Sequence, residues 1–261
     1  MTNIIEIEDI PPNARLIDAR FRLSDPKLAV NLYKEAHIPG ATFVDLESDL
    51  SGRKTGQNGR HPLPSEPDLV RLFCRLGIDQ DTPVVAYDDT DHSGAARLWM
   101  LLRWMGHEKV YVLNGGLSAW RRAGKAIESG ETTKPQAKNF TKRQPLINFV
   151  SKEQILGRQL VDARAPERYR GEVEPIDPKA GHIPGAVNLY YKRAMSTDGK
   201  FLPLDELRTL LNFEHPVFYC GSGVTAAVLL LIAAELEMPS ELYPGSWSEW
   251  CATNNAPIEL G

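Results

Sequence analysis

Cys220 lies in a loop whose composition suits a nucleophilic thiol. The apolar run 217–219 before it predicts a buried strand, and the small residues 221–223 after it precede a helix expected to begin near Thr225. Backbone N–H groups and the positive end of the helix dipole would then face the sulfur. Because such groups favour the anionic form of a thiol, the pattern predicts a reactive thiolate. The alternative is an inert, buried cysteine, which is a common fate of free cysteines.

The chain carries the same four landmarks twice, in the same order. They pair 16–20 with 160–164, 37–41 with 182–186, 84–88 with 217–220, and 115–120 with 245–250. A duplication of this length predicts two copies of one domain, each of roughly 120 residues and large enough for its own core. At the position of Cys220 the first copy has Asp88, so only the second copy carries a candidate nucleophile.

Each copy alternates apolar runs with amphipathic stretches, which predicts an α/β fold with a mostly parallel sheet flanked by helices. The expected strands cover residues 14–19, 83–87, 110–113, 159–163, 216–219 and 241–243. The expected helices cover residues 67–76, 95–105, 204–211 and 224–236. A polar, breaker-rich stretch at 130–138 indicates a linker. We therefore expect an inactive N-terminal domain at 1–128, a linker at 129–147 and a catalytic C-terminal domain at 148–261.

The paired Asp-Ala-Arg and His-Ile-Pro-Gly-Ala signatures and the loop Cys-Gly-Ser-Gly-Val-Thr resemble those of two-domain rhodanese-type sulfurtransferases. The resemblance spans nearly the whole chain, and it implies two tandem rhodanese-like domains, the first inactive and the second active. In that family the active cysteine takes sulfur as a persulfide from a small anionic donor, 3-mercaptopyruvate or thiosulfate, and passes it on. The resemblance implies this role for Cys220 without a cofactor or metal. The implied acceptors are cyanide, a small thiol, or a thioredoxin-like or other sulfur-accepting protein.

The resemblance also implies which residues bind the substrate. Arg168 matches an anion-binding arginine, whose planar guanidinium would hold a carboxylate or thiosulfate through two hydrogen bonds. His61 matches a histidine that lines the active-site cleft. An ordinary exposed position is the alternative for both residues. The loop would hold the persulfide with its backbone N–H groups and polarise the donor with its hydroxyls, and its binding residues are Gly221, Ser222, Gly223, Val224 and Thr225.

Two departures from the family pattern leave the choice of donor open. The mercaptopyruvate type usually has a second arginine where this chain has Ile176, although Lys179 is a nearby cation. The thiosulfate type usually has basic residues directly after the cysteine, whereas residues 221–226 contain none. Because the neighbours of the sulfur are neutral and Arg168 is expected to stand away from the loop, the sequence leans towards 3-mercaptopyruvate.

Four polar residues of the duplicated motifs are expected to be structural. Asp18 and Asp162 each end a strand before Ala-Arg, and His37 and His182 each begin a His-Ile-Pro-Gly-Ala turn. Catalytic groups are not expected in the copy that lacks a nucleophile, so we interpret these side chains as partners of nearby backbone or arginine groups.

Two other functions would also use a reactive cysteine. A cysteine-loop phosphatase needs a longer loop closed by an arginine that binds phosphate, and residues 221–226 include no basic residue, which argues strongly against it. A non-enzymatic persulfide carrier would retain the cysteine and depend on a dedicated partner. The glycine-rich loop argues against this second alternative but leaves it open.

Composition narrows the class of protein. The net charge of −4 includes no basic stripe, which argues against a nucleic-acid partner. The most apolar run, 228–234, is far shorter than the roughly 20 residues that span a bilayer. The cysteines Cys74, Cys220 and Cys251 are too widely spaced for a disulfide framework or a zinc site. We therefore expect a cytoplasmic protein with no membrane partner, in which a reactive thiol stays reduced.

Overall fold

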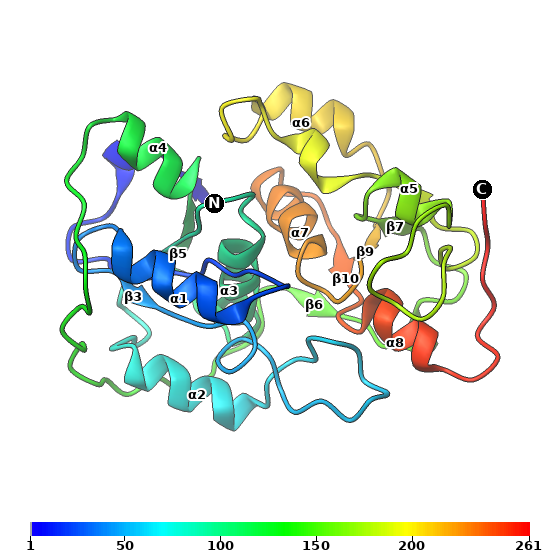
Figure 1. The fold of residues 1–261 in the computed structure, drawn as a ribbon, viewed down its shortest axis with the longest axis horizontal. Coiled ribbons are helices and arrows are strands. Elements are labelled where there is room, and N and C mark those ends of the chain that lie inside the picture. The colour runs from blue at the N-terminus through cyan, green and yellow to red at the C-terminus, as the bar shows by residue number, and fades with distance from the viewer. Residues whose placement is uncertain (1) are drawn as a thin grey trace. The chain divides into compact units, whose positions relative to one another are not determined.

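The computed structural model describes residues 2–261, which form two compact units (Figure 1). The first unit consists of residues 2–52, Pro64–Leu146 and Ser196–Phe201. The second unit consists of Arg53–Leu63, Ile147–Met195 and Leu202–Gly261. Each unit therefore includes a short segment from the other half of the sequence.

The first unit is built on a parallel sheet of five strands in the order β1-β5-β4-β2-β3. Its strands are β1 (Ile4–Ile5), β2 (Arg15–Asp18), β3 (Thr42–Phe43), β4 (Val84–Tyr87) and β5 (Val110–Leu113). Its helices are η1 (Ile7–Asp9), α1 (Pro26–Glu35), α2 (Glu66–Arg75), α3 (Ser93–Trp104) and α4 (Gly116–Arg122). The central strand β4 is buried at every residue, which is typical of a parallel sheet covered on both faces.

The second unit repeats this topology, with a parallel sheet in the order β6-β10-β9-β7-β8. Its strands are β6 (Asn148–Phe149), β7 (Leu160–Asp162), β8 (Val187–Asn188), β9 (Val217–Tyr219) and β10 (Glu241–Leu242). Its helices are η2 (Lys152–Gln154), α5 (Pro166–Tyr169), η3 (Tyr191–Ala194), α6 (Leu204–Leu210), α7 (Ala226–Glu235) and α8 (Ser246–Ala252). The strand order matches that of the first unit, so the predicted duplication and the α/β fold class are confirmed.

The Asp-Ala-Arg motifs form buried ion pairs in both units. The Arg20 guanidinium donates to the carboxylate of Asp18, and Arg164 donates to Asp162 at 2.7 Å. All four side chains are nearly inaccessible to solvent. Each arginine also donates to a backbone carbonyl near the next motif, Arg164 to Gly181 at 2.7 Å. These contacts tie the end of a strand to the following turn, which is the structural role expected of the two aspartates.

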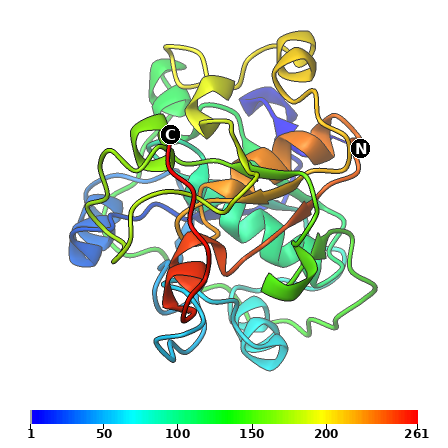
Figure 2. The same ribbon diagram turned by 90° about the vertical axis from the view of Figure 1, so that its right-hand side faces the viewer.

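The two motif histidines also have structural contacts. Nδ1 of His182 donates to the carbonyl oxygen of Tyr169 at 2.8 Å, and the ring of His182 stacks on that of Tyr169. His37 makes the same contacts with Tyr33. After α8 the chain (red in Figure 2) runs back so that the backbone of Glu259 pairs with that of His182. The histidines therefore hold turns in place.

The polar stretch expected to link the domains contacts the first unit. The backbone N–H of Phe140 donates to Sγ of Cys74 at 3.3 Å, and its ring packs edge-on against Phe73. Cys74 thus has a packing role in the first unit. The boundaries of the two domains stay a prediction.

Helix α7 forms the apolar centre of the second unit. It is buried from Ala226 to Ala233, with leucine and alanine on every side, which is typical of a core helix. It packs against β9 and β10 and fixes the end of the loop that begins at Cys220. Within residues 2–261, no helix combines the length and the apolar character needed to cross a membrane.

Candidate active site

Strand β9 and helix α8 hold the backbone of Cys220 from two sides. The residue follows the buried strand directly and is 1% exposed. Its N–H donates to Oγ of Ser246 at 3.1 Å, and its carbonyl accepts the N–H of Trp247 at 2.9 Å. The next carbonyl, that of Gly221, accepts the N–H of Ser248 at 2.9 Å. The start of the loop is therefore rigidly positioned.

Gly223 turns the loop back onto the sulfur. Its backbone N–H donates to Sγ of Cys220 at 3.2 Å. Its φ of +72° lies in the left-handed region, and a Cβ at this position would lie 2.4 Å from the carbonyl oxygen of Pro244. Only glycine fits these two constraints. The sequence predicted that backbone N–H groups of the loop face the sulfur, and this hydrogen bond is one such contact.

Asp88 shows what the same loop does in the first unit. It follows β4 as Cys220 follows β9, and its carbonyl accepts the N–H of Leu117 as that of Cys220 accepts the N–H of Trp247. Its carboxylate oxygens accept four backbone N–H groups at 3.1–3.2 Å, those of Thr90, His92, Gly94 and Ala95. Burial nevertheless raises the pKa of the Asp88 carboxyl. In the first unit this loop therefore directs four backbone N–H groups at the side chain that follows the strand, although burial works against the charged form of Asp88.

His61 and Ser222 form a buried pair beside the nucleophile. Nδ1 of His61 lies 2.8 Å from Oγ of Ser222, and the two residues are 2% and 6% exposed. Both residues belong to the second unit, His61 through the segment Arg53–Leu63 and Ser222 through the segment Leu202–Gly261. The sequence indicated each residue separately. The structure places the Ser222 hydroxyl where the imidazole can orient it.

Arg168 reaches the loop from the short helix α5. A Cβ built on Gly221 would lie 3.6 and 3.7 Å from Nη1 and Nη2 of Arg168. The expectation that this arginine stands away from the loop is therefore wrong. The Arg168 guanidinium is held there by the carboxylates of Glu174 and Asp177, to which its Nη2 donates at 2.7 and 3.1 Å.

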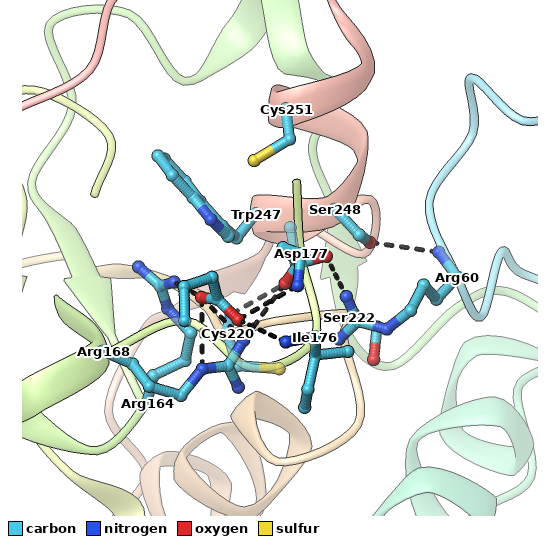
Figure 3. A network of polar contacts seen from close by, with 12 residues as sticks. Arg60, Arg164, Arg168, Ile176, Asp177, Cys220, Ser222, Trp247, Ser248 and Cys251 are labelled. Atoms are coloured by element: carbon cyan, nitrogen blue, oxygen red, sulfur yellow. Dashed lines mark hydrogen bonds and ion pairs between the residues drawn. The ribbon is translucent and has the colours of Figure 1, made fainter. Parts of the chain in front are cut away.

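Arg60 is a second cation at the loop, and the sequence analysis missed it. Its Nη2 would lie 2.8 Å from a Cβ on Gly221, closer than either nitrogen of Arg168. Arg60 and Arg168 also pair with the two oxygens of one carboxylate, that of Asp177 (Figure 3). In the sequence, only the position of Arg60 next to His61 indicated that Arg60 could lie at the active site.

These two arginines belong to a chain of alternating charges that starts at the buried Asp-Ala-Arg motif and ends at the partly exposed Arg60. The order of the chain is Asp162, Arg164, Glu174, Arg168, Asp177 and Arg60. Burial raises the pKa of the Asp177 carboxyl despite the neighbouring arginines. For Glu174 burial acts in the same direction, but hydrogen bonds from Arg168 and from backbone N–H groups outweigh it and lower the pKa. The site therefore holds equal numbers of acidic and basic groups.

The other expected residues lie in less direct positions. Val224 is buried, and Thr225 stands at the N-cap of α7 without a capping side-chain bond. Ile176 exposes 46% of its surface and brings no charge to the site. Lys179 contributes its carbonyl, which accepts the indole N–H of Trp247 at 3.0 Å. A second basic group at the loop comes instead from a distant segment, that of Arg60.

Comparisons with known proteins agree with this geometry. The family model for the Rhodanese-like domain matches residues 5–123 and 145–253. The chain is 42% identical to a Mycobacterium tuberculosis protein provisionally named a thiosulfate sulfurtransferase, over 94% of the chain and 90% of the relative. It is 43% identical to a Pseudomonas aeruginosa protein provisionally named a 3-mercaptopyruvate sulfurtransferase, over 96% and 93%. The crystal structure of SseA, a 3-mercaptopyruvate sulfurtransferase from Escherichia coli, matches with a TM-score of 0.80 at 31% identity, over 95% of this chain and 99% of that one.

Proposed function

This chain belongs to the rhodanese family and is a sulfurtransferase, and from that premise we propose that Cys220 carries the transferred sulfur as a persulfide. One observation carries the proposal. The sulfur of Cys220 accepts the N–H of Gly223 in a loop whose counterpart binds the Asp88 carboxylate with four N–H groups. A backbone N–H group directed at the sulfur stabilises the negative charge of both a thiolate and a persulfide.

In the first half-reaction the Cys220 thiolate attacks the transferable sulfur of the donor. A new S–S bond forms while the donor's bond to that sulfur breaks, and the electron pair of the broken bond leaves with the donor. Mercaptopyruvate leaves as the enolate of pyruvate, which takes up a proton, whereas thiosulfate leaves as sulfite. The Ser222 hydroxyl, oriented by His61, donates to the oxygen on which negative charge develops.

In the second half-reaction an acceptor nucleophile attacks the outer sulfur of the persulfide. The S–S bond breaks and Cys220 leaves as a thiolate, which the N–H of Gly223 again stabilises. Cyanide gives thiocyanate, and a thiol gives a new persulfide. We include a thioredoxin-like or other sulfur-accepting protein among the acceptors.

We propose 3-mercaptopyruvate as the preferred donor, for a reason that differs from the sequence argument. The two relatives of nearly equal identity carry different donor names, so similarity alone does not decide. Arg60 and Arg168 offer N–H groups to a carboxylate, but Asp177 and Glu174 balance their charge. A dianion such as thiosulfate gains most from surplus positive charge, whereas one carboxylate needs only well-placed donors.

The proposal is tested by turnover of both donors by the wild type and by Cys220→Ser. We expect the variant to fold normally and to lose sulfur transfer to cyanide with either donor, because no other cysteine lies in a comparable loop. Activity near that of the wild type would contradict the persulfide role. A wild type that is loaded only by another persulfide protein, and turns over neither donor, would favour the carrier alternative.

We also propose that the reaction takes place in the cytoplasm. Its support is the state of Cys74, Cys220 and Cys251, which are free thiols in the structure. A reducing compartment keeps a nucleophilic thiol available. Fractionation of cells that produce the protein is the direct test.

A further inference from the structure

The second unit contains a cavity of about 460 Å³ next to the catalytic loop. Its wall combines residues of the segment Arg53–Leu63, the stretch from β6 to η2, and the turn that leads into α8. Pro244 of this turn lines the cavity, and its carbonyl oxygen also lies against Gly223 of the loop. The described residues that line the cavity include neither Cys220 nor Arg168. The cavity is therefore separate from the place where sulfur is transferred.

The phenol of Tyr243 lines this cavity and leaves its hydroxyl without a partner. Tyr243 directly follows β10 and is 1% exposed. Within residues 2–261 its buried hydroxyl makes no hydrogen bond. Burial and the neighbouring carboxylate of Glu249 raise the pKa of Tyr243, which keeps the phenol neutral. A buried hydroxyl without a partner is costly, so a ligand group that hydrogen-bonds to it would bind favourably.

Glu249 brings a negative charge to the same cavity. A Cβ built on Gly245 would overlap Oε2 of Glu249, so the carboxylate folds back over the turn before α8. Glycine at position 245 leaves room for it. Glu249 is half-buried and forms no ion pair with any residue of the described range 2–261. A partly buried carboxylate of this kind gains from a cation that can donate hydrogen bonds to it.

The other charges in the wall of the cavity balance each other. Lys152 pairs with Glu153 at 3.9 Å, and Oγ of Ser151 donates to the Glu153 carboxylate at 2.7 Å. Both charged residues line the cavity together with Glu249. One negative charge therefore remains, and it lies beside the hydroxyl of Tyr243. A ligand with a single positive charge would neutralise it.

The rest of the wall is mostly apolar. A cavity of this volume is large enough for a small organic molecule. An apolar wall favours a ligand whose body is a hydrocarbon chain or an aromatic ring. The apolar lining residues are Pro62, Leu63, Phe149, Val150 and Pro244.

We propose that Tyr243 and Glu249 form a binding site for a small organic amine in its protonated form. The ammonium group donates hydrogen bonds to the Glu249 carboxylate and to the phenol oxygen of Tyr243, and the apolar body of the amine lies against the rest of the wall. This site goes beyond the sulfurtransferase function, because Cys220 takes no part in it.

The test is isothermal titration calorimetry with phenethylamine at neutral pH, where this amine is protonated. The proteins compared are the wild type, Tyr243→Phe, Glu249→Gln and the matched control Glu214→Gln. Glu214 is an exposed glutamate of the second unit outside the cavity wall. We expect a Kd of about 1 mM or below for the wild type and the control. Glu249→Gln should raise the Kd about ten- to a hundred-fold and Tyr243→Phe about two- to tenfold, because a charged and a neutral hydrogen bond are lost.

The charge of the ligand and the integrity of the fold are checked separately. The alcohol 2-phenylethanol has the same size without the charge, and it should bind at least about ten times more weakly than phenethylamine. Tyr243→Phe removes a hydroxyl without a partner, so it should unfold at the wild-type urea concentration or above. Cys220→Ser should bind phenethylamine as tightly as the wild type, even though it is expected to lose sulfur transfer.

Three results would overturn the proposal. The first is a wild type that shows no saturable binding of phenethylamine. The second is a shared wild-type Kd in Glu249→Gln and Glu214→Gln. The third is equal binding of the amine and the alcohol. None of these results bears on the persulfide role of Cys220, which the turnover of Cys220→Ser tests independently.

Discussion

Two neighbouring glycines of the catalytic loop should respond to the same substitution in opposite ways. Gly223 has a φ of +72°, and an added Cβ would lie 2.4 Å from the backbone oxygen of Pro244. Gly221 lies outside the left-handed region, and its added Cβ would meet Nη2 of Arg60 at 2.8 Å. The first obstacle is rigid backbone, whereas the second is the tip of a flexible side chain.

The magnitudes follow from these contacts. In Gly223→Ala the left-handed conformation costs roughly 1–2 kcal/mol, and relief of the clash costs roughly 1–3 kcal/mol. We therefore expect the free energy of unfolding of the second unit to fall by about 2–5 kcal/mol. Persulfide formation should slow by about ten- to a hundred-fold, because the N–H that stabilises the thiolate moves away. In Gly221→Ala stability should change by less than about 1 kcal/mol, and the KM for the donor should rise because Arg60 is displaced.

The assay combines urea unfolding, followed by the fluorescence of Trp247 and Trp250, with rapid-mixing measurement of persulfide formation. Both tryptophans lie on α8 in the second unit. The reasoning is refuted if Gly223→Ala unfolds and reacts like the wild type. It is equally refuted if Gly221→Ala loses as much stability as Gly223→Ala.

Three further predictions follow from the buried charges and thiols. Asp162→Ala leaves the buried Arg164 with Glu174, 3.3 Å away, as its remaining acidic partner, so urea unfolding should show a loss of up to about 3–5 kcal/mol, and a loss below about 1 kcal/mol would contradict a stabilising Asp162–Arg164 pair. Asp177→Asn leaves one arginine charge unbalanced, so kcat/KM for thiosulfate should rise relative to that for 3-mercaptopyruvate, and an unchanged ratio would count against charge balance as the selector. Burial raises the pKa of the Cys251 thiol to about 11, so roughly one molecule in a thousand carries this thiolate at pH 8. Iodoacetamide at pH 8 should therefore leave Cys251 unlabelled in a peptide mass map, and its labelling ahead of Cys220 would be the contrary result.

Patterns among residues close in sequence were enough to predict those parts of the fold that depend only on such residues. The Asp162–Arg164 pair spans two positions, and the strand before Cys220 is a short apolar run, so both are visible in the sequence. Two-residue strands such as β3 and β8 were missed, because they are too short to show a period. The amphipathic helix α1 was missed as well, although Pro26 and the N-cap Asp25 mark its start.

The donor site was harder to predict because its parts are distant in sequence. His61 and Ser222 are 161 positions apart, and Arg60 and Asp177 are 117 apart. No helical or strand period connects such residues. They meet because the segment Arg53–Leu63 belongs to the second unit, and tertiary contacts such as that of Arg60 with Ser248 determine this. The sequence could name His61 only by family resemblance, and it gave Arg60 no comparable signal.

The central claim, that Cys220 carries the transferred sulfur, is tested most directly by mass spectrometry of the Cys220 peptide after treatment with 3-mercaptopyruvate. We expect this peptide to gain the mass of one sulfur atom and to lose it again when cyanide is added. Peptides containing Cys74 or Cys251 should stay unchanged. A stable sulfur adduct on either of those cysteines, with an unmodified Cys220 peptide in protein that turns over the donor, would contradict the account.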